Sequence, residues 1–176
     1  MQPVGNYFAI VETEAGATTP NKELGFTKSH HFVLSYNRKL SENLHAKVET
    51  YYQHLYNIPI HTDPSKTDAL INREWGFETE AMANDGIGRN MGLELTLEQY
   101  LHKGLYYLLS ASLYDSKYRA ADNEWYNTRY NGRFALSFTA GKEFTPNKHN
   151  KNRTYGINLK GNYNGGFRSS PIDLEA

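Results

Sequence analysis

MGLELTLEQYLHKGLYYLLSASLYDSKY, residues 91–118, is the stretch that decides the expected fold. Apolar side chains occupy every second position on both sides of its LHKG sequence. These positions are Met91, Leu93, Leu95 and Leu97 before LHKG, and Leu105, Tyr107, Leu109, Ala111 and Leu113 after it. A period of two is typical of a β-strand with one apolar face, so the stretch predicts a hairpin. The leucines of this hairpin must face either a protein core or a lipid bilayer.

The same period of two recurs along the rest of the chain. The alternating segments are 31–38, 44–54, 90–98, 105–114, 133–143 and 154–163. No convincing amphipathic helix lies between them. The sequence therefore predicts an all-β fold, an antiparallel up-and-down meander of about six long strands.

The connections between these segments alternate between short and long. The short ones are 39–43, 101–104 and 145–152, and the long ones are 57–86 and 115–132. In a meander this alternation places all short turns at one end of the sheet and all long loops at the other. Transmembrane β-barrels have this asymmetry, and their strands need roughly 9–11 residues to cross the bilayer. Both features favour a membrane barrel.

Composition agrees with this prediction and excludes some other classes of protein. The 176 residues carry 19 basic and 19 acidic side chains, so no net charge favours nucleic acid. No cysteine is present, and no apolar run of roughly 18 residues predicts a transmembrane helix. The start, MQPVGNYFAIVETEAG, lacks the pattern of a signal peptide. The 14 tyrosines suit half-buried positions in β-structure in general, and equally the aromatic girdles of outer-membrane barrels.

Six strands are too few to close a membrane barrel, since the smallest barrels have about eight. An open sheet would leave unpaired backbone groups in lipid, which is energetically very costly. We therefore expect 1–176 to form a partial barrel domain of a longer protein, without a plug domain and without the terminal strand. Residues 1–29 are expected to form an extracellular loop that leads into the first strand.

Three blocks of the sequence carry a resemblance to a known family. They are NKELGFTKSHHFVLSYNR, GIGRNMGLELTLEQYLHKGLYYLLSASLYDSKY and NTRYNGRFALSFTAGKEF. The second block contains the pattern G-x-G-x-N-x-G-x-E-x-x-L, formed by Gly86, Gly88, Asn90, Gly92, Glu94 and Leu97. In order and content the blocks resemble the C-terminal part of the β-barrel of TonB-dependent outer-membrane receptors of the Bacteroides group. The resemblance extends from about residue 21 to residue 170.

This resemblance implies a location in the outer membrane and a role in nutrient uptake. The family has a barrel of about 22 strands with an N-terminal plug. The implied partners are outer-membrane lipid, the rest of the barrel and the plug, a TonB-type energy coupler that acts through the N-terminal part, and a surface lipoprotein. The chain shows no plug and no coupling box, so transport is expected of the parent receptor rather than of this segment alone.

Aromatic residues in the two long loops are the candidate substrate contacts. Trp125, Tyr126, Arg129 and Tyr130 fall in one loop, and Trp75 falls in the other. Aromatic rings beside polar groups suit the capture of a sugar or a peptide, through stacking and hydrogen bonds. The same rings can equally pin a loop to the barrel rim.

The sequence predicts no catalytic, cofactor-binding or metal site. GIGRNMG has the wrong glycine spacing for a dinucleotide loop and precedes a strand rather than a helix. His45 and Glu49 share a strand face but lie about 13 Å apart along it, too far to bind one metal ion. A different class of function stays open, a soluble all-β ligand-binding module such as a carbohydrate-binding sandwich. A small complete porin-like protein is a third hypothesis, which the strand count opposes.

Overall fold

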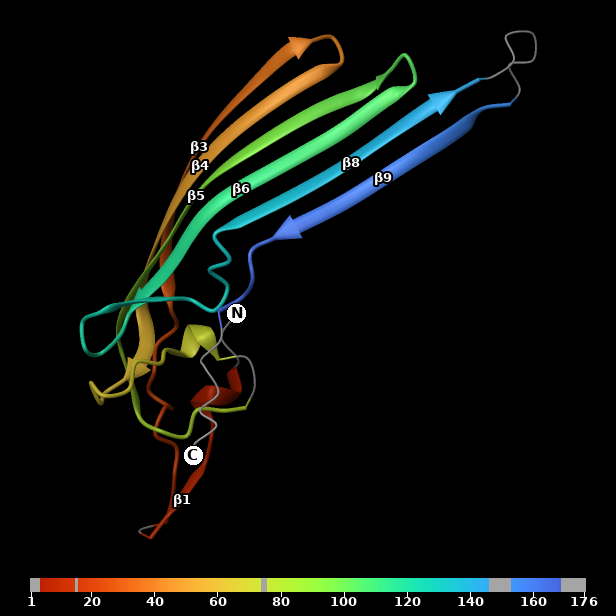
Figure 1. Ribbon diagram of the computed structural model, residues 1–176. Helices are drawn as coiled ribbons and strands as arrows, with labels where there is room; N and C mark the ends of the chain where they lie inside the picture. Colours follow the sequence, from red (N-terminus) through yellow and green to blue (C-terminus); the bar gives the residue numbers. More distant parts are fainter. Residues whose placement is uncertain (1–3, 15, 74–75, 146–152, 169–176) are drawn as a thin grey trace, which may run out of the picture.

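The computed structural model describes residues 4–14, 16–73, 76–145 and 153–168, and these form an all-β protein. Six long strands lie side by side in one curved sheet (Figure 1). They are β3 (Lys28–Ser41), β4 (Leu44–His61), β5 (Met82–His102), β6 (Leu105–Arg119), β8 (Phe134–Phe144) and β9 (Tyr155–Asn164). Each is antiparallel to the next along the chain, which confirms the predicted meander. The sheet does not close: within the described residues β3 and β9 are its two open edges.

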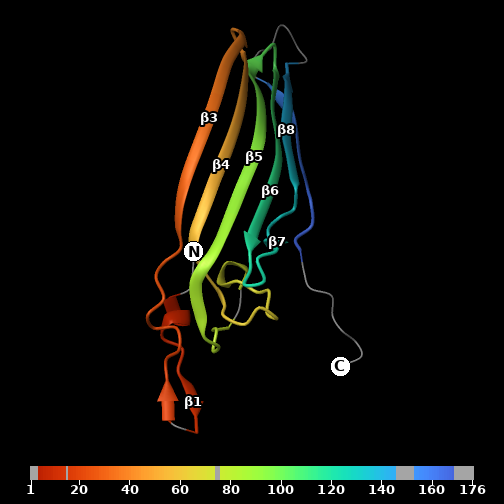
Figure 2. The same ribbon diagram turned by 90° about the vertical axis from the view of Figure 1, so that its left-hand side faces the viewer.

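Five short elements complete the described fold. They are η1 (Val4–Tyr7), β1 (Val11–Thr13), β2 (Gly16–Thr18), η2 (Leu70–Asn72) and β7 (Trp125–Asn127). β1 and β2 form a separate two-stranded sheet, whereas β7 pairs with β6. Figure 2 shows the short elements near the end of the sheet that lies opposite its two-residue turns. No helix in the described part of the chain is long and apolar enough to span a membrane.

The turns are sorted by length as the sequence predicts. β5 and β6 are joined by Lys103 and Gly104, whose φ angles are 50° and 76°. Two positive φ angles are typical of the two-residue turn that matches the twist of a hairpin. β3 and β4 are also joined by a two-residue turn, whereas residues 62–81 connect β4 to β5 at the opposite end. The turn at 146–152 lies outside the described residues.

The three central strands are longer than the sequence predicts. β4 continues beyond residue 54 through an irregularity at Asn57, where the register with β5 shifts and φ is 57°. β5 begins at Met82 rather than near residue 90, and β6 continues to Arg119. Part of each predicted long loop is therefore strand. The connection from β6 to β8 also contains β7, which the sequence analysis did not predict.

The register separates an apolar face of the sheet from a polar face. One row that crosses all six long strands consists of Tyr36, Val48, Leu95, Ala111, Leu136 and Tyr163. The adjacent row, on the opposite face, consists of Asn37, Lys47, Thr96, Ser110, Ser137 and Asn162. Neighbouring residues of a strand point to opposite faces, so in these two rows the predicted alternation holds across all six strands.

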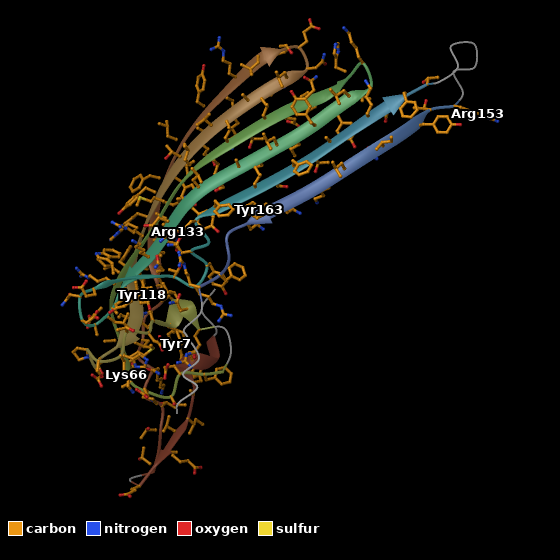
Figure 3. All side chains as sticks on the ribbon, viewed as in Figure 1. Tyr7, Lys66, Tyr118, Arg133, Arg153 and Tyr163 are labelled. Atoms are coloured by element: carbon orange, nitrogen blue, oxygen red, sulfur yellow. The ribbon has the colours of Figure 1, made fainter. Side chains whose placement is uncertain are left out.

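A small hydrophobic core covers the polar face at its loop end. Ile58 is fully buried there and packs with Ile60, Ala69, Tyr118 and Ala120. Figure 3 shows Tyr118 at this end of the sheet. The glycines of the GIG sequence make the packing possible, because a Cβ at Gly86 would lie 2.6 Å from Cγ2 of Ile60. These glycines lie inside β5.

The N-terminal segment is tied to the loop between β4 and β5 by buried asparagines. Nδ2 of Asn21 donates to the carbonyl oxygens of Glu78 (3.3 Å) and Glu80 (2.9 Å). Oδ1 of Asn21 accepts from the Met82 amide at 2.9 Å, and Oδ1 of Asn6 accepts from the Glu78 amide at 2.7 Å. The segment predicted as a loop lead-in thus supplies the hydrogen-bond partners of a second loop, and buried backbone groups need such partners.

Candidate functional site

An open pocket of about 430 Å³ lies on the polar face over β3, β4, β5 and β6, and we term it the polar-face pocket. It is lined by His31, Val33, Glu49, Tyr51, Gln53, Asn90, Glu94, Tyr114, Asp115, Ser116 and Tyr130. Most of these residues come from three adjacent rows of the sheet, and Tyr130 reaches the pocket from the loop that follows β7. Strand residues supply rigid walls for such a site.

A hydrogen-bonded ladder holds the loop-end wall of this pocket. Nδ2 of Asn90 donates to Oε1 of Gln53 at 2.8 Å, and Oγ of Ser116 donates to Oδ1 of Asn90 at 2.5 Å. Oγ1 of Thr128 then donates to Oγ of Ser116 at 2.6 Å. The ladder crosses three strands and ends in the loop beyond β7. Connected polar groups of this kind fix one another's orientation.

The next row of the sheet places tyrosines on the two sides of a glycine. Tyr51, Gly92 and Tyr114 lie opposite one another on β4, β5 and β6. A Cβ at Gly92 would lie 2.6 Å from Cε1 and Cζ of Tyr51, so the Tyr51 ring occupies the space above the glycine backbone. The absence of a side chain at position 92 therefore gives the pocket an aromatic floor.

The following row brings two carboxylates face to face. Glu49 on β4 lies directly opposite Glu94 on β5, an arrangement that is electrostatically unfavourable for like charges. Nζ of Lys47 lies 2.7 Å from Oε2 of Glu49 and compensates that carboxylate. Within the part of the chain that the structure describes, Glu94 has no ion-pair partner. One of the two negative charges is thus uncompensated.

A second hollow, of about 390 Å³, lies where the two long loops meet, and we term it the loop-junction pocket. Its lining residues are Thr67, Asp68, Asn72, Tyr118, Tyr126, Asn127, Arg129 and Arg168. Oδ1 of Asn72 accepts from the Arg129 amide at 3.0 Å, which joins the two loops. Tyr118 donates its hydroxyl to the Thr67 carbonyl at 2.8 Å. Burial raises the pKa of Tyr118 to about 12.

The structure divides the predicted substrate contacts among different places. Tyr126 and Arg129 line the loop-junction pocket, whereas Tyr130 lines the polar-face pocket. Trp125 lines neither the loop-junction pocket nor the polar-face pocket. The centre of its ring lies 4.9 Å from the guanidinium carbon of Arg89 in a cation–π contact. Trp75 lies outside the described residues.

Tyr126 also has a structural role in its own loop. Its hydroxyl donates to Oδ2 of Asp122 at 2.5 Å, which raises the pKa of Tyr126 and lowers that of Asp122. This hydrogen bond joins two residues that lie four positions apart in the same connection between β6 and β8.

A charged cluster at the β4–β5 loop, in which His61 and Glu78 are buried, was not predicted. Nε2 of His61 lies 3.7 Å from Oε2 of Glu78, and its Nδ1 lies 3.6 Å from Oε2 of Glu80. Arg73 pairs with Glu78, and Lys66 pairs with Glu80. The hydrogen bond from Lys66 lowers the pKa of Glu80, which in turn raises the pKa of Lys66. Among the described residues no group of histidine, cysteine or acidic side chains is arranged to hold a metal ion.

Comparisons with known proteins identify no relative. No sequence family matches the chain, and neither curated proteins nor solved structures gave a significant match. A function for this chain therefore has to be inferred from its own geometry, together with the resemblance of its three sequence blocks.

Proposed function

We propose that this chain forms part of the wall of the β-barrel of an outer-membrane receptor of the TonB-dependent type, which takes up nutrients. The observation that carries the proposal is the pair of adjacent rows, one fully apolar from Tyr36 to Tyr163 and one fully polar from Asn37 to Asn162. A barrel wall needs this separation, because one face meets lipid and the other lines an aqueous interior.

The apolar face is uncovered, which supports lipid as its surroundings. Leu34 is 71% exposed, Leu95 45% and Ile157 66%, although all three are aliphatic side chains within strands. The loops and the small core pack on the other face, where Tyr118 and Ile58 lie. A continuous apolar surface of this kind is unfavourable in water and stable against hydrocarbon.

Strand length and the open edges support the same proposal. β3 has 14 residues, β5 has 21 and β6 has 15, all more than the roughly 9–11 needed to cross a bilayer. Edges such as β3 and β9 must be paired within lipid, because hydrocarbon offers their backbone groups no partner. We propose that further strands of the intact receptor pair with both.

The proposed role of each surface follows from this placement. The polar face would line the interior and contact the plug, while the loop-junction pocket would lie at the mouth of the barrel. Import through such a receptor needs binding and a conformational change in the plug, and no catalytic residue in the wall. Energy would come from the coupling protein through parts outside this segment.

Single cysteines test the assignment of the two faces, because the chain has no cysteine of its own. Leu93→Cys and Leu95→Cys carry a spin label on the apolar face, whereas Glu94→Cys and Thr96→Cys carry it on the polar face of the same strand. In the intact protein in lipid, oxygen should relax the first pair of labels more strongly. A water-soluble nickel chelate should relax the second pair more strongly.

The outcomes separate this proposal from the alternative. If labels at 93 and 95 are shielded from both reagents, the leucine face lies in a protein core and the chain is a soluble ligand-binding module. If all four positions respond alike, the wall assignment is wrong. Uptake by the intact receptor that continues without its energy-coupling protein would overturn the TonB-dependent part alone.

A further inference from the structure

We propose that the polar-face pocket is a binding site for an organic cation with an alkylated ammonium group. This inference goes beyond the role of the sheet as a barrel wall, and it does not depend on that role. Every group that it uses belongs to the described strands and the loop beyond β7, at the pocket of about 430 Å³.

The uncompensated carboxylate determines the charge of the ligand. Glu94 lies opposite Glu49 and has no cationic partner among the described residues, whereas Glu49 is paired with Lys47. A ligand cation beside Glu94 would relieve the repulsion between the two carboxylates. An anionic ligand would add to this repulsion, so anions are excluded as occupants.

The aromatic floor determines which kind of cation fits. The Tyr51 ring lies over Gly92, Tyr114 continues the same row, and Tyr130 approaches from the loop. Alkylated ammonium groups bind well to the faces of aromatic rings, because their charge is diffuse and they are weakly hydrated. A bare metal ion would instead need several ligands, and among the described residues no three His, Cys, Asp or Glu side chains are grouped to hold one.

The amide groups of the pocket are partly engaged with one another. Asn90 both donates to Gln53 and accepts from Ser116, and Ser116 accepts in turn from Thr128. Beside this ladder the pocket is lined by His31, Val33 and Asp115 as well as by Glu94 and the tyrosines. Among these groups the Glu94 carboxylate and the tyrosine rings are the ones that suit a diffuse cation.

Two probes of nearly equal shape test the proposal by titration calorimetry on the intact protein. Choline carries the quaternary ammonium, and 3,3-dimethyl-1-butanol has the same shape without the charge. Choline should bind at least about tenfold more tightly than the alcohol. Glu94→Gln, which keeps the size of the side chain, should weaken choline binding by about tenfold or more. Tyr51→Leu should weaken choline binding, and Tyr51→Phe should retain it.

Glu98→Gln is the matched control, because Glu98 lies on the same face of the same strand but faces His45 outside the pocket. It should leave choline binding unchanged. Equal binding of the two probes, no effect of Glu94→Gln, or no choline binding at millimolar concentration would each overturn the proposal. Circular dichroism of each variant shows whether its fold is intact, and Tyr51→Phe separates loss of the ring from loss of the fold. The spin-label experiment above is independent of this one, so the two proposals can fail separately.

Discussion

The ring of Tyr51 occupies the place that a side chain of Gly92 would take. A Cβ at position 92 would lie 2.6 Å from Cε1 and 2.7 Å from Oη of Tyr51. The two residues face each other across β4 and β5. A glycine in a central strand normally weakens the strand, so its presence here indicates that a neighbouring group needs the space.

Gly92→Ala is therefore expected to destabilise the protein by about 1–3 kcal/mol or to displace the Tyr51 ring, because the added methyl group overpacks the site. The same change in a Tyr51→Ala background should cost much less, since the ring is gone. Equilibrium unfolding of the four proteins measures this coupling. Gly156→Ala in β9 is the control, because its nearest atom is Cγ of Glu143 at 3.9 Å. Additive effects at positions 51 and 92 would contradict the contact.

Asn21→Ala should loosen the attachment of the N-terminal segment to the β4–β5 loop. The change leaves two buried carbonyl groups and the Met82 amide without a partner, and each such loss costs about 1–3 kcal/mol. Hydrogen exchange should quicken over residues 76–82. Lys22→Ala, at the exposed neighbouring position, should leave the exchange rates unchanged. Equal protection in both variants would show that the asparagine is dispensable.

Lys66→Met should raise the pKa of Glu80 towards its ordinary value of 4.5. The pKa of Glu80 is lower in the folded protein than in the unfolded chain. The pairing with Lys66 therefore stabilises the loop fully when the pH is above the pKa of Glu80 in the unfolded chain. This stabilisation is lost as the pH falls through the pKa of Glu80 in the folded protein. Nuclear magnetic resonance titration of the carboxyl groups measures the change. Asp122 is an internal control, because the hydrogen bond from Tyr126 is the main cause of its lowered pKa and Lys66 makes no contribution to it. An unchanged Glu80 titration in the variant would exclude the pairing.

Tyr118 should make the docking of residues 62–73 sensitive to alkali. Its pKa is raised from 10.0 to about 12, so the neutral hydroxyl stabilises the fold fully below pH 10.0 and the stabilisation is lost as pH rises through about 12. Ultraviolet titration of phenolate formation, with hydrogen exchange of the loop, should follow this loss. Tyr118→Phe removes the hydrogen bond to the Thr67 carbonyl, so it should lower the free energy of unfolding at neutral pH by about 0.5–1.5 kcal/mol. In this variant the hydrogen-exchange rates of residues 62–73 should then show no step between pH 10.0 and about 12.

Leu95→Arg and Thr96→Arg should differ strongly although they are adjacent in β5. If the apolar face meets lipid, arginine at 95 costs about 2–4 kcal/mol near the middle of the bilayer. Arginine at 96 points to the polar face and should cost little. Folding of the intact protein into lipid vesicles, titrated with denaturant, measures the difference. Similar free energies for the two variants would remove the support for a lipid-facing surface.

The sheet could be predicted from the sequence because strand alternation is a local signal. Residues 31–38 and 105–114 each show their apolar face without reference to any other part of the chain. The GIG sequence interrupts this alternation, so the pattern predicts a loop where β5 in fact begins. β7 is too short to show a period at all.

The candidate site depends on register and on contacts between distant residues, which no local pattern encodes. The alternation alone puts Glu49 and Glu94 on the polar sides of their strands, but only the pairing of β4 with β5 puts them opposite each other. The contact of Asn21 with Glu78 joins residues 57 positions apart. The aromatic loop residues were visible in the sequence, but Trp125 and Tyr126 are neighbours in a strand and point to opposite faces.

The two-residue turn at Lys103 and Gly104 has a consequence for the order in which the sheet forms. It joins strands whose contacts are close in sequence, and closing so small a loop costs little chain entropy. The β5–β6 hairpin is therefore expected to form within microseconds, and the β3–β4 hairpin likewise. The pairing of β4 with β5 must await closure of the loop at 62–81. The sheet would then assemble from preformed hairpins, and the row that holds Glu49 and Glu94 would come together only when two hairpins dock.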